Sequence, residues 1–182
     1  MVQQTNNFHI REATVDDLKY TDDIVRVVNE AYQTGDGWTS PKHIVSEPRT
    51  NATEIKDLIE RNGTTHVLYL ALDGDEIVGT IMYEQPNDKG EAYCTLLAVA
   101  PTYQSRGAGG QLFRYMLEQM KNKGIPTATL TTFASRSDVI SWYKKLGFVE
   151  ESERVDFSFH YKDAKVKPTG DSDLVIMKRP LV

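Results

Sequence analysis

Three glycines and an arginine near the middle of the chain form a pattern that can bind phosphate. Gly107, Gly109 and Gly110 lie directly after Arg106. Glycine has no Cβ, so an anion can approach its backbone closely, and the unpaired N–H groups in the first turn of a helix attract negative charge. The spacing completes neither G-x-G-x-x-G nor a P-loop. We expect a diphosphate ligand of another kind; the alternative is a turn that only connects two elements.

The residues on either side of the glycines predict the elements that position them. An apolar run of strand type ends near Val99 and is followed by Pro101. After the glycines, apolar residues recur at helical spacing, namely Leu112, Phe113, Met116, Leu117 and Met120. Gly124 then provides a helix stop. A strand therefore leads into the glycine-rich turn, and a helix begins there.

Two blocks of sequence carry a resemblance to a known family. The run Val99–Gly109 contains V-x-P followed by Q-x-x-G-x-G, which begins at Gln104. The run Ser141–Phe148 reads SWYKKLGF, with Tyr143 four residues before Gly147. In this order, the blocks resemble the acyl-CoA-binding motif and the later helix-and-strand motif of the GNAT superfamily of N-acetyltransferases. The resemblance covers about residues 8 to 180, although its motifs occupy only the middle third.

This resemblance implies an enzyme that moves an acetyl group from acetyl-CoA, its co-substrate, to a primary amine of a small molecule, protein or peptide. The amine would attack the thioester directly, through a tetrahedral intermediate. A non-catalytic CoA-binding sensor, or a partner-binding module with the same fold, is the alternative function. Transfer of another acyl group, such as succinyl, is a third possibility. No metal is expected.

The resemblance also implies which residues hold the co-substrate. The backbone of the strand end would pair with the pantetheine arm, and the amide of Leu97 or Val99 would face the oxyanion. Amides of the glycine-rich turn would hold the pyrophosphate. Arg136 stands where the family often has asparagine, and it is a candidate for a phosphate contact instead. The complete set of CoA-binding candidates is Leu97, Ala98, Val99, Gln104, Ser105, Arg106, Gly107, Ala108, Gly109, Gly110 and Arg136.

By the same resemblance, Tyr143 occupies the position of the general acid that protonates the departing sulfur. The alternative role is that of a core aromatic residue, because Trp142 and Phe148 lie close to it in the sequence. For the general base, the chain departs from the family's usual pattern. Related enzymes often place a carboxylate where this chain has Tyr93 and Thr131.

That departure favours deprotonation of the amine through water. Glu84, at the end of a predicted strand, is the candidate for a water-mediated base, and Glu91 is a second one; either residue could instead be a solvated charge at a strand end. Cys94 is interpreted as a buried and inert thiol, because no His–Asp partner accompanies it in the sequence.

The acceptor amine is expected near the segment between the first two helices, which commonly shapes the acceptor pocket in this family. The candidates are Trp38, Thr39, Arg49 and Tyr93. Arg49 either binds a carboxylate or caps a helix end, and Trp38 either lines the acceptor site or packs its loop onto the core. The identity of the amine does not follow from the sequence.

Composition limits the other functions. A formal net charge of −5 disfavours nucleic-acid binding. The single cysteine excludes an intrachain disulfide and favours a reducing, cytoplasmic location. No apolar stretch approaches the length of a membrane span, so no membrane contact is expected. We expect a monomer or a homodimer.

The 182 residues predict one acetyltransferase-like domain over 1–182, with a loose N-terminus at 1–6 and an exposed loop at 162–173. Hydrophobic periodicity and turn signals predict the order β-α-α-β-β-β-α-β-α-β-β. This order corresponds to an α/β sandwich in which helices flank a mixed, mostly antiparallel sheet, as in GNAT folds.

The first helix is predicted to be long and to follow a capping pair of Thr14 and Asp17, and the second to be capped by Asn51. Turn residues on both sides predict a strand over Glu76–Glu84.

Overall fold

The computed structural model describes residues 7–33, 48–156 and 173–182. Its helices and strands follow the predicted order, with two additional 3-10 turns. The elements are β1 (His9–Glu12), η1 (Val15–Tyr20), α1 (Thr21–Gln33), α2 (Ala52–Glu60), β2 (His66–Asp73), β3 (Glu76–Glu84), β4 (Glu91–Val99), η2 (Pro101–Tyr103), α3 (Ala108–Asn122), β5 (Thr127–Phe133), α4 (Ser137–Lys145), β6 (Val149–Asp156) and β7 (Asp173–Pro180).

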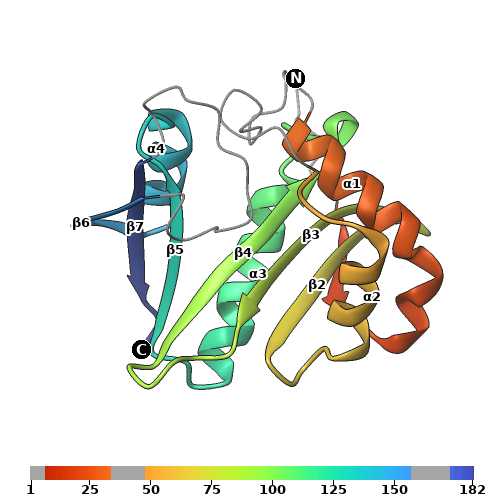
Figure 1. The fold of residues 1–182 in the computed structure, drawn as a ribbon, viewed down its shortest axis with the longest axis horizontal. Coiled ribbons are helices and arrows are strands. Elements are labelled where there is room, and N and C mark those ends of the chain that lie inside the picture. The colour runs from red at the N-terminus through yellow and green to blue at the C-terminus, as the bar shows by residue number, and fades with distance from the viewer. Residues whose placement is uncertain (1–6, 34–47, 157–172) are drawn as a thin grey trace.

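The strands form one seven-stranded sheet in the order β1-β2-β3-β4-β5-β7-β6 (Figure 1). Every neighbouring pair is antiparallel except β4 and β5, which are parallel. A parallel pair needs a crossover connection, and α3 provides it between β4 and β5. The mixed, mostly antiparallel sheet with flanking helices confirms the predicted fold class.

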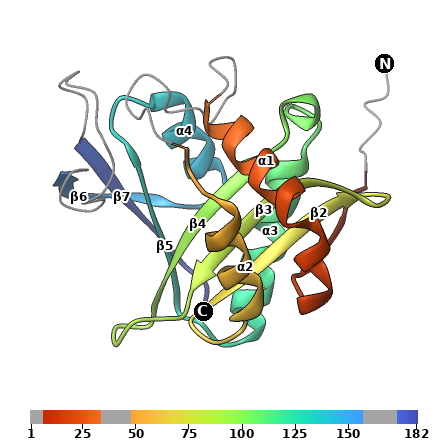
Figure 2. The same ribbon diagram turned by 45° about the vertical axis from the view of Figure 1, so that its right-hand side comes forward.

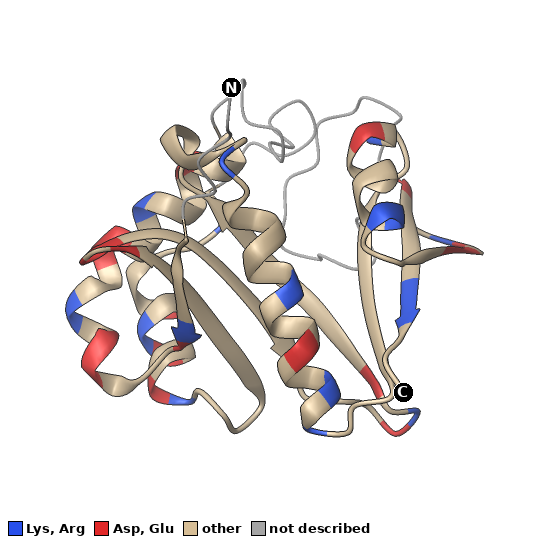
Figure 3. Ribbon diagram, turned by 180° about the vertical axis from the view of Figure 1, so that it is seen from behind, with Lys and Arg blue, Asp and Glu red and all other residues tan. Residues whose placement is uncertain are grey.

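Two apolar cores lie on opposite faces of the sheet. Helices α1 and α2 pack on one face, where Ile24, Ile55 and Leu96 are buried together. Helix α3 packs on the other face, and the aromatic residues of α4 join that second core. Figure 2 shows α1 and α2 in front of the strands and α3 behind them. On the exposed sides of the helices, acidic and basic residues are interspersed (Figure 3).

The first helical segment differs from the prediction of one long helix. Thr14 and Asp17 form the expected capping pair, in which the Asp17 carboxylate accepts from the Thr14 N–H at 2.8 Å. The chain then continues as the 3-10 turn η1, and α1 begins only at Thr21. The Thr21 hydroxyl donates to the Leu18 carbonyl at 2.7 Å. This tight turn lets Asp17 remain buried, where it accepts two hydrogen bonds of 2.7 Å from Arg11.

Candidate active site

The two central parallel strands part after a short stretch of pairing. Three consecutive pairs join β4 to β5, from Glu91 with Thr127 to Tyr93 with Thr129. Beyond Tyr93, the described residues show no further pairing between these strands, whereas β5 stays paired with β7 as far as Phe133. Figure 1 shows β4 and β5 diverging toward the end of the molecule where α3 and α4 begin. One edge of β4 is therefore available to a ligand from Cys94 onward.

The alternation of the strand decides which backbone groups face that open edge. The N–H of Ala100 donates to the carbonyl of Val78 on β3 at 2.8 Å. Successive residues of a strand turn their polar groups to opposite sides, so Ala98 also faces β3, where it pairs with Thr80. Leu97 and Val99 face the open edge. The Val99 carbonyl already accepts one hydrogen bond, from the side-chain amide of Gln104 at 3.1 Å.

A β-bulge lies in β4 at the start of the open stretch, and our sequence analysis did not foresee it. Leu96 has a φ of 54°, and the register with β3 shifts between Thr80 and Met82. The buried Thr80 hydroxyl donates to the Leu96 carbonyl at 2.8 Å. Leucine rarely adopts a left-handed conformation, so this contact from the neighbouring strand helps to hold it. A threonine inside an apolar strand was the only sequence signal for the bulge.

The turn after β4 presents a row of backbone donors. Gly107, with a φ of 86°, is the N-cap of α3, and Ser105 also has a positive φ of 64°. The amides of Gln104 and Arg106 donate to carbonyls within the turn. In the described part of the chain, five other amides have no protein acceptor, and these belong to Ser105, Gly107, Ala108, Gly109 and Gly110. We call the residues 104–110 the amide cradle.

Among the described residues, the neighbours of the amide cradle fix its shape and leave space beside Gly109. A Cβ on Gly109 would meet only the Val99 side chain, at 3.6 Å. The Tyr103 hydroxyl donates to the Glu76 carboxylate at 3.0 Å, which ties η2 to the β2–β3 turn. The guanidinium of Arg106 lies 5.0 Å from the centre of the Tyr103 ring. The cradle thus combines open amides, a helix N-terminus and one cation, which is the arrangement that a pyrophosphate requires.

Helix α3 can approach the sheet closely because β3 has a glycine beneath it. A Cβ at Gly79 would lie 2.8 Å from Cδ1 of Leu112 and 3.0 Å from the carbonyl oxygen of Ala98. Gly79 pairs with Val99, the last residue of β4. The glycine therefore sets the depth at which the first turns of α3 sit beside the end of β4.

Tyr143 lies on α4 among aromatic rings. Its ring centre is 5.7 Å from that of Phe113 and 5.9 Å from that of Phe148. Burial raises the pKa of the Tyr143 hydroxyl above its usual range, and the nearby Tyr32 and Cys94 add to this rise. The phenol thus remains protonated at neutral pH. The ring packs against the core, and the role of its hydroxyl as the general acid stays a prediction.

Tyr93 and Thr131, the two positions where related enzymes often have a carboxylate, form a hydrogen bond with each other. The Tyr93 hydroxyl and the Thr131 Oγ1 are 2.6 Å apart, across the point where β4 and β5 separate. Glu84 is exposed at the end of β3. Since Tyr83 pairs with Cys94, continuing the same register places Glu84 beside Tyr93 on the α1/α2 face.

Glu91 and Cys94 have surroundings that suit structural roles. Lys178 donates to the Glu91 carboxylate at 2.6 Å, and this hydrogen bond lowers the pKa of Glu91. A carboxylate engaged in this way is a poor general base. Cys94 is buried, and burial raises the pKa of its thiol. A thiol that stays protonated is a poor nucleophile.

Two further predicted residues, Arg136 and Arg49, lie outside the amide cradle. Arg136 immediately precedes α4 and forms a bidentate pair with Asp138, at 3.0 and 2.9 Å. Arg49 lies beside β4, with Nη2 3.5 Å from the Thr95 hydroxyl. Trp38 and Thr39 lie outside the described residues.

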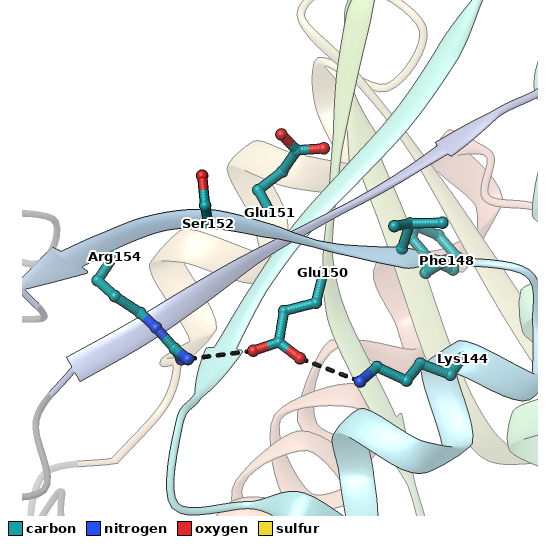
Figure 4. A pocket seen from close by; sticks show the side chains of 7 residues that line it. Lys144, Phe148, Glu150, Glu151, Ser152 and Arg154 are labelled. Carbon is teal, nitrogen blue, oxygen red and sulfur yellow. Dashed lines mark hydrogen bonds and ion pairs between the residues drawn. The ribbon is translucent and has the colours of Figure 1, made fainter.

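An open pocket between α4 and β6 is separate from the amide cradle. Figure 4 shows Glu150 between Lys144 and Arg154. Each cation is 3.1 Å from a Glu150 oxygen, so the three charges are mutually paired. In the ranges that the structure describes, no cluster of three or more possible metal ligands occurs. None of the described helices is both long and apolar enough to cross a membrane.

Comparisons with known proteins give the family of the chain. The sequence matches the family model "Acetyltransferase (GNAT) family" over residues 28–148. N-alpha-acetyltransferase 30 from Schizosaccharomyces pombe is 30% identical over 83 residues, which are 44% of this chain and 55% of that protein. The ribosomal protein bS18-alanine N-acetyltransferase of Salmonella typhimurium is 32% identical over 91 residues, 50% and 57% of the two proteins. The chain spans little more than half the length of these curated relatives.

A solved structure extends the likeness to the whole fold. The PaiA N-acetyltransferase of Thermoplasma acidophilum, in complex with coenzyme A, has a TM-score of 0.68 at 19% identity, and the match covers 96% of this chain and 99% of that one. At this identity the likeness shows the fold alone. Because the family match covers more than half of the sequence, the chain belongs to the GNAT family of acetyltransferases.

Proposed function

We propose that this protein transfers an acetyl group from acetyl-CoA to a primary amine. The observation that carries the proposal is the row of five open amides where α3 begins, at the wide end of the β4–β5 split. These amides and Arg106 would bind the pyrophosphate, and the polar backbone groups of Leu97 and Val99 would pair with the pantetheine arm. The coenzyme A complex of the Thermoplasma neighbour supports this choice of ligand.

Each chemical requirement of acyl transfer has a candidate on this chain. Free alkylamines are mostly protonated near neutral pH, so the amine must first lose a proton, and Glu84 would take it through water. An N–H of Leu97 or Val99 would stabilise the negative charge that develops on the carbonyl oxygen. Tyr143 would donate its proton to the departing sulfur, because its raised pKa keeps the phenol protonated.

The acceptor class is proposed to be the amine of a peptide or an amino acid. The printed names of the two curated relatives describe N-alpha-acetylation and acetylation of an alanine of ribosomal protein bS18. A strand edge that is open beside a partly exposed cation, Arg49, suits a small peptide-like amine. A cytoplasmic location and the monomeric or dimeric state stay predictions from the sequence.

The test uses the full chain, acetyl-CoA and a panel of amines. Calorimetry measures CoA binding, and the release of free thiol measures transfer. We expect CoA binding together with thiol release that depends on the added amine, and mass spectrometry should find the acetylated product. Absence of CoA binding would refute the proposal.

One observation favours a CoA sensor as the second candidate function. Tyr93 and Thr131 occupy the usual carboxylate positions and bond to each other at 2.6 Å. A sensor would bind CoA with normal affinity and release no thiol with any amine. The same two measurements therefore separate the two functions.

A further inference from the structure

We infer that Arg49 recognises a carboxylate on the acceptor, so that this enzyme favours amines carrying an acidic group close to the nitrogen. The inference rests on the proposed acetyltransferase function and specifies its substrate class. Free acidic amino acids and peptides with an acidic first residue share this chemistry. Three features of Arg49 support the inference: its fixed position, its unused donors and its place beside the open edge of β4.

The position of Arg49 is fixed by the residue that follows it. The side-chain amide of Asn29, on α1, accepts from the Thr50 N–H at 3.0 Å and donates to the Thr50 carbonyl at 2.9 Å. Thr50 is buried, and its hydroxyl donates to the Glu54 carboxylate at 2.8 Å. Asn51 caps α2 by accepting from the Glu54 N–H at 3.0 Å. Arg49 therefore projects from a backbone that is held on two sides.

The guanidinium of Arg49 has few close partners in the part of the chain that the structure describes. Its side chain is 28% exposed, and its contacts among the described residues are long ones. Nη2 is 3.5 Å from the Thr95 hydroxyl, Nη1 is 4.0 Å from a Glu54 oxygen, and the group lies 5.7 Å from the centre of the Tyr32 ring. A guanidinium has five N–H donors. Most of these donors have no close acceptor among residues 7–33, 48–156 and 173–182.

The contact with Thr95 places this cation beside the predicted reaction centre. Thr95 comes two residues after Tyr93, the last residue of β4 that pairs with β5, and directly before the bulge at Leu96. Tyr32, which lies next to the guanidinium, is also close enough to Tyr143 to affect its electrostatics. An amine that approaches the thioester from the α1/α2 face would pass within reach of Arg49.

A carboxylate is the ligand that matches this geometry. Guanidinium groups bind carboxylates through two parallel hydrogen bonds, and such charged pairs are among the stronger contacts in proteins. The protein as a whole carries a net charge of −5, so its overall electrostatic field does not attract anionic substrates. Selection of an acidic acceptor therefore needs a local cation, and Arg49 supplies one. Loss of a charged hydrogen bond changes affinity by a factor of roughly 10 to 100.

The experiment compares acceptors that differ only in charge. Initial rates of acetyl transfer are measured for the α-amides of Asp against Asn, which differ by the one carboxylate, and for short peptides that begin with Asp against Asn. We expect kcat/KM to be about 10- to 100-fold higher for the acidic member of a pair. The pair that shows the preference identifies whether the acceptor is a small amine or a peptide.

Three variants test the role of Arg49. Arg49→Gln should abolish the preference by lowering kcat/KM for the Asp acceptor more than for the Asn acceptor, whereas Arg49→Lys should keep part of the preference. Arg61→Gln is the matched control, because Arg61 is an exposed arginine at the end of α2 that pairs only weakly with Asp57, at 3.5 Å. The control removes the same charge and should leave the preference intact.

Two outcomes would overturn the inference. Equal rates for Asp and Asn acceptors in the unmodified enzyme would do so, and so would a preference that survives in Arg49→Gln. In both cases acetyl transfer itself continues, so the proposed function stands. If no amine is acetylated, the proposed function fails instead. Calorimetry of the CoA-loaded protein with the α-amides of N-acetyl-aspartate against N-acetyl-asparagine then decides the role of Arg49, and equal binding would refute it.

Discussion

A charge placed at Gly109 should separate the stability of the fold from binding of the co-substrate. Gly109 is the second residue of α3, and its amide has no acceptor among the described residues. An added Cβ would make an ordinary contact of 3.6 Å with Val99. Gly109→Asp can therefore be accommodated without rearrangement. Its carboxylate would lie where the amide cradle is predicted to hold the pyrophosphate.

The two expected effects have opposite signs. An aspartate in the first turn of a helix stabilises the helix by about 0.3–1 kcal/mol through the macrodipole. Against the pyrophosphate, one pair of unit charges roughly 5 Å apart repels by about 3 kcal/mol at an effective dielectric constant of about 20. Screening by salt at this open site reduces the repulsion. We expect a net loss of about 1.5–3 kcal/mol, or about 10- to 150-fold weaker binding of CoA.

Calorimetry with CoA and thermal unfolding of the unliganded protein measure the two effects. Gly109→Asn is the matched control, since its side chain has nearly the same size and no charge. The asparagine variant should lose much less affinity than the aspartate variant, and the midpoint of unfolding should not fall in either. Unchanged CoA affinity in Gly109→Asp would show that the pyrophosphate does not bind in the cradle. A lowered unfolding midpoint would refute the assignment of free space around Gly109.

Three further predictions test the catalytic acid, the packing of α3 and the pH dependence. Tyr143→Phe should lower kcat with little change in CoA affinity, and an unaltered kcat in steady-state kinetics would remove the proposed proton donor. Gly79→Ala should cost about 1–3 kcal/mol in chemical denaturation, because the new Cβ would lie 2.8 Å from the buried Leu112; a neutral result would mean that α3 can move away. The hydrogen bond from Arg11 lowers the pKa of Asp17 in the folded protein. The pair therefore stabilises the fold above about pH 4, which is the pKa of aspartate in the unfolded chain. Its contribution disappears as the pH falls through the lower pKa of the folded state. Asp17→Asn should therefore cost about 1–3 kcal/mol at pH 7 and weaken the loss of stability in acid, and a titration of stability with the same acid slope in both proteins would contradict this.

Patterns within single segments predicted the fold well. The limits Glu76–Glu84 were predicted to the residue for β3, because turn residues bound an apolar run on both sides. Asn51 was recognised as the cap of α2, and its side chain does accept from the Glu54 amide. The error at the start of α1 came from long-range contacts. Burial of Asp17 against Arg11 favours a 3-10 turn, and no local pattern contains that information.

The candidate site was predictable only where its chemistry lies within one segment. The consecutive residues of the glycine-rich turn predict a phosphate-binding backbone, and the structure has open amides there. The bulge at Leu96 depends on the Thr80 hydroxyl from another strand, and the bond between Tyr93 and Thr131 joins residues 38 positions apart. Such contacts form only after the sheet assembles. The groups that flank the open edge of β4 could therefore be identified only from the structure.

A general base that acts only through water and the position of Arg49 beside the acceptor can be explained together. A carboxylate beside an ammonium group stabilises the protonated amine and raises its pKa, whereas a nearby cation lowers it. A guanidinium that binds the acceptor carboxylate would remove the first effect and add the second. The amine would then lose its proton more readily, and a distant base such as Glu84, acting through water, would suffice. Recognition of an acidic acceptor by Arg49 would thus also prepare the nucleophile, which explains how a site with Tyr93 and Thr131 at the usual carboxylate positions can still support transfer.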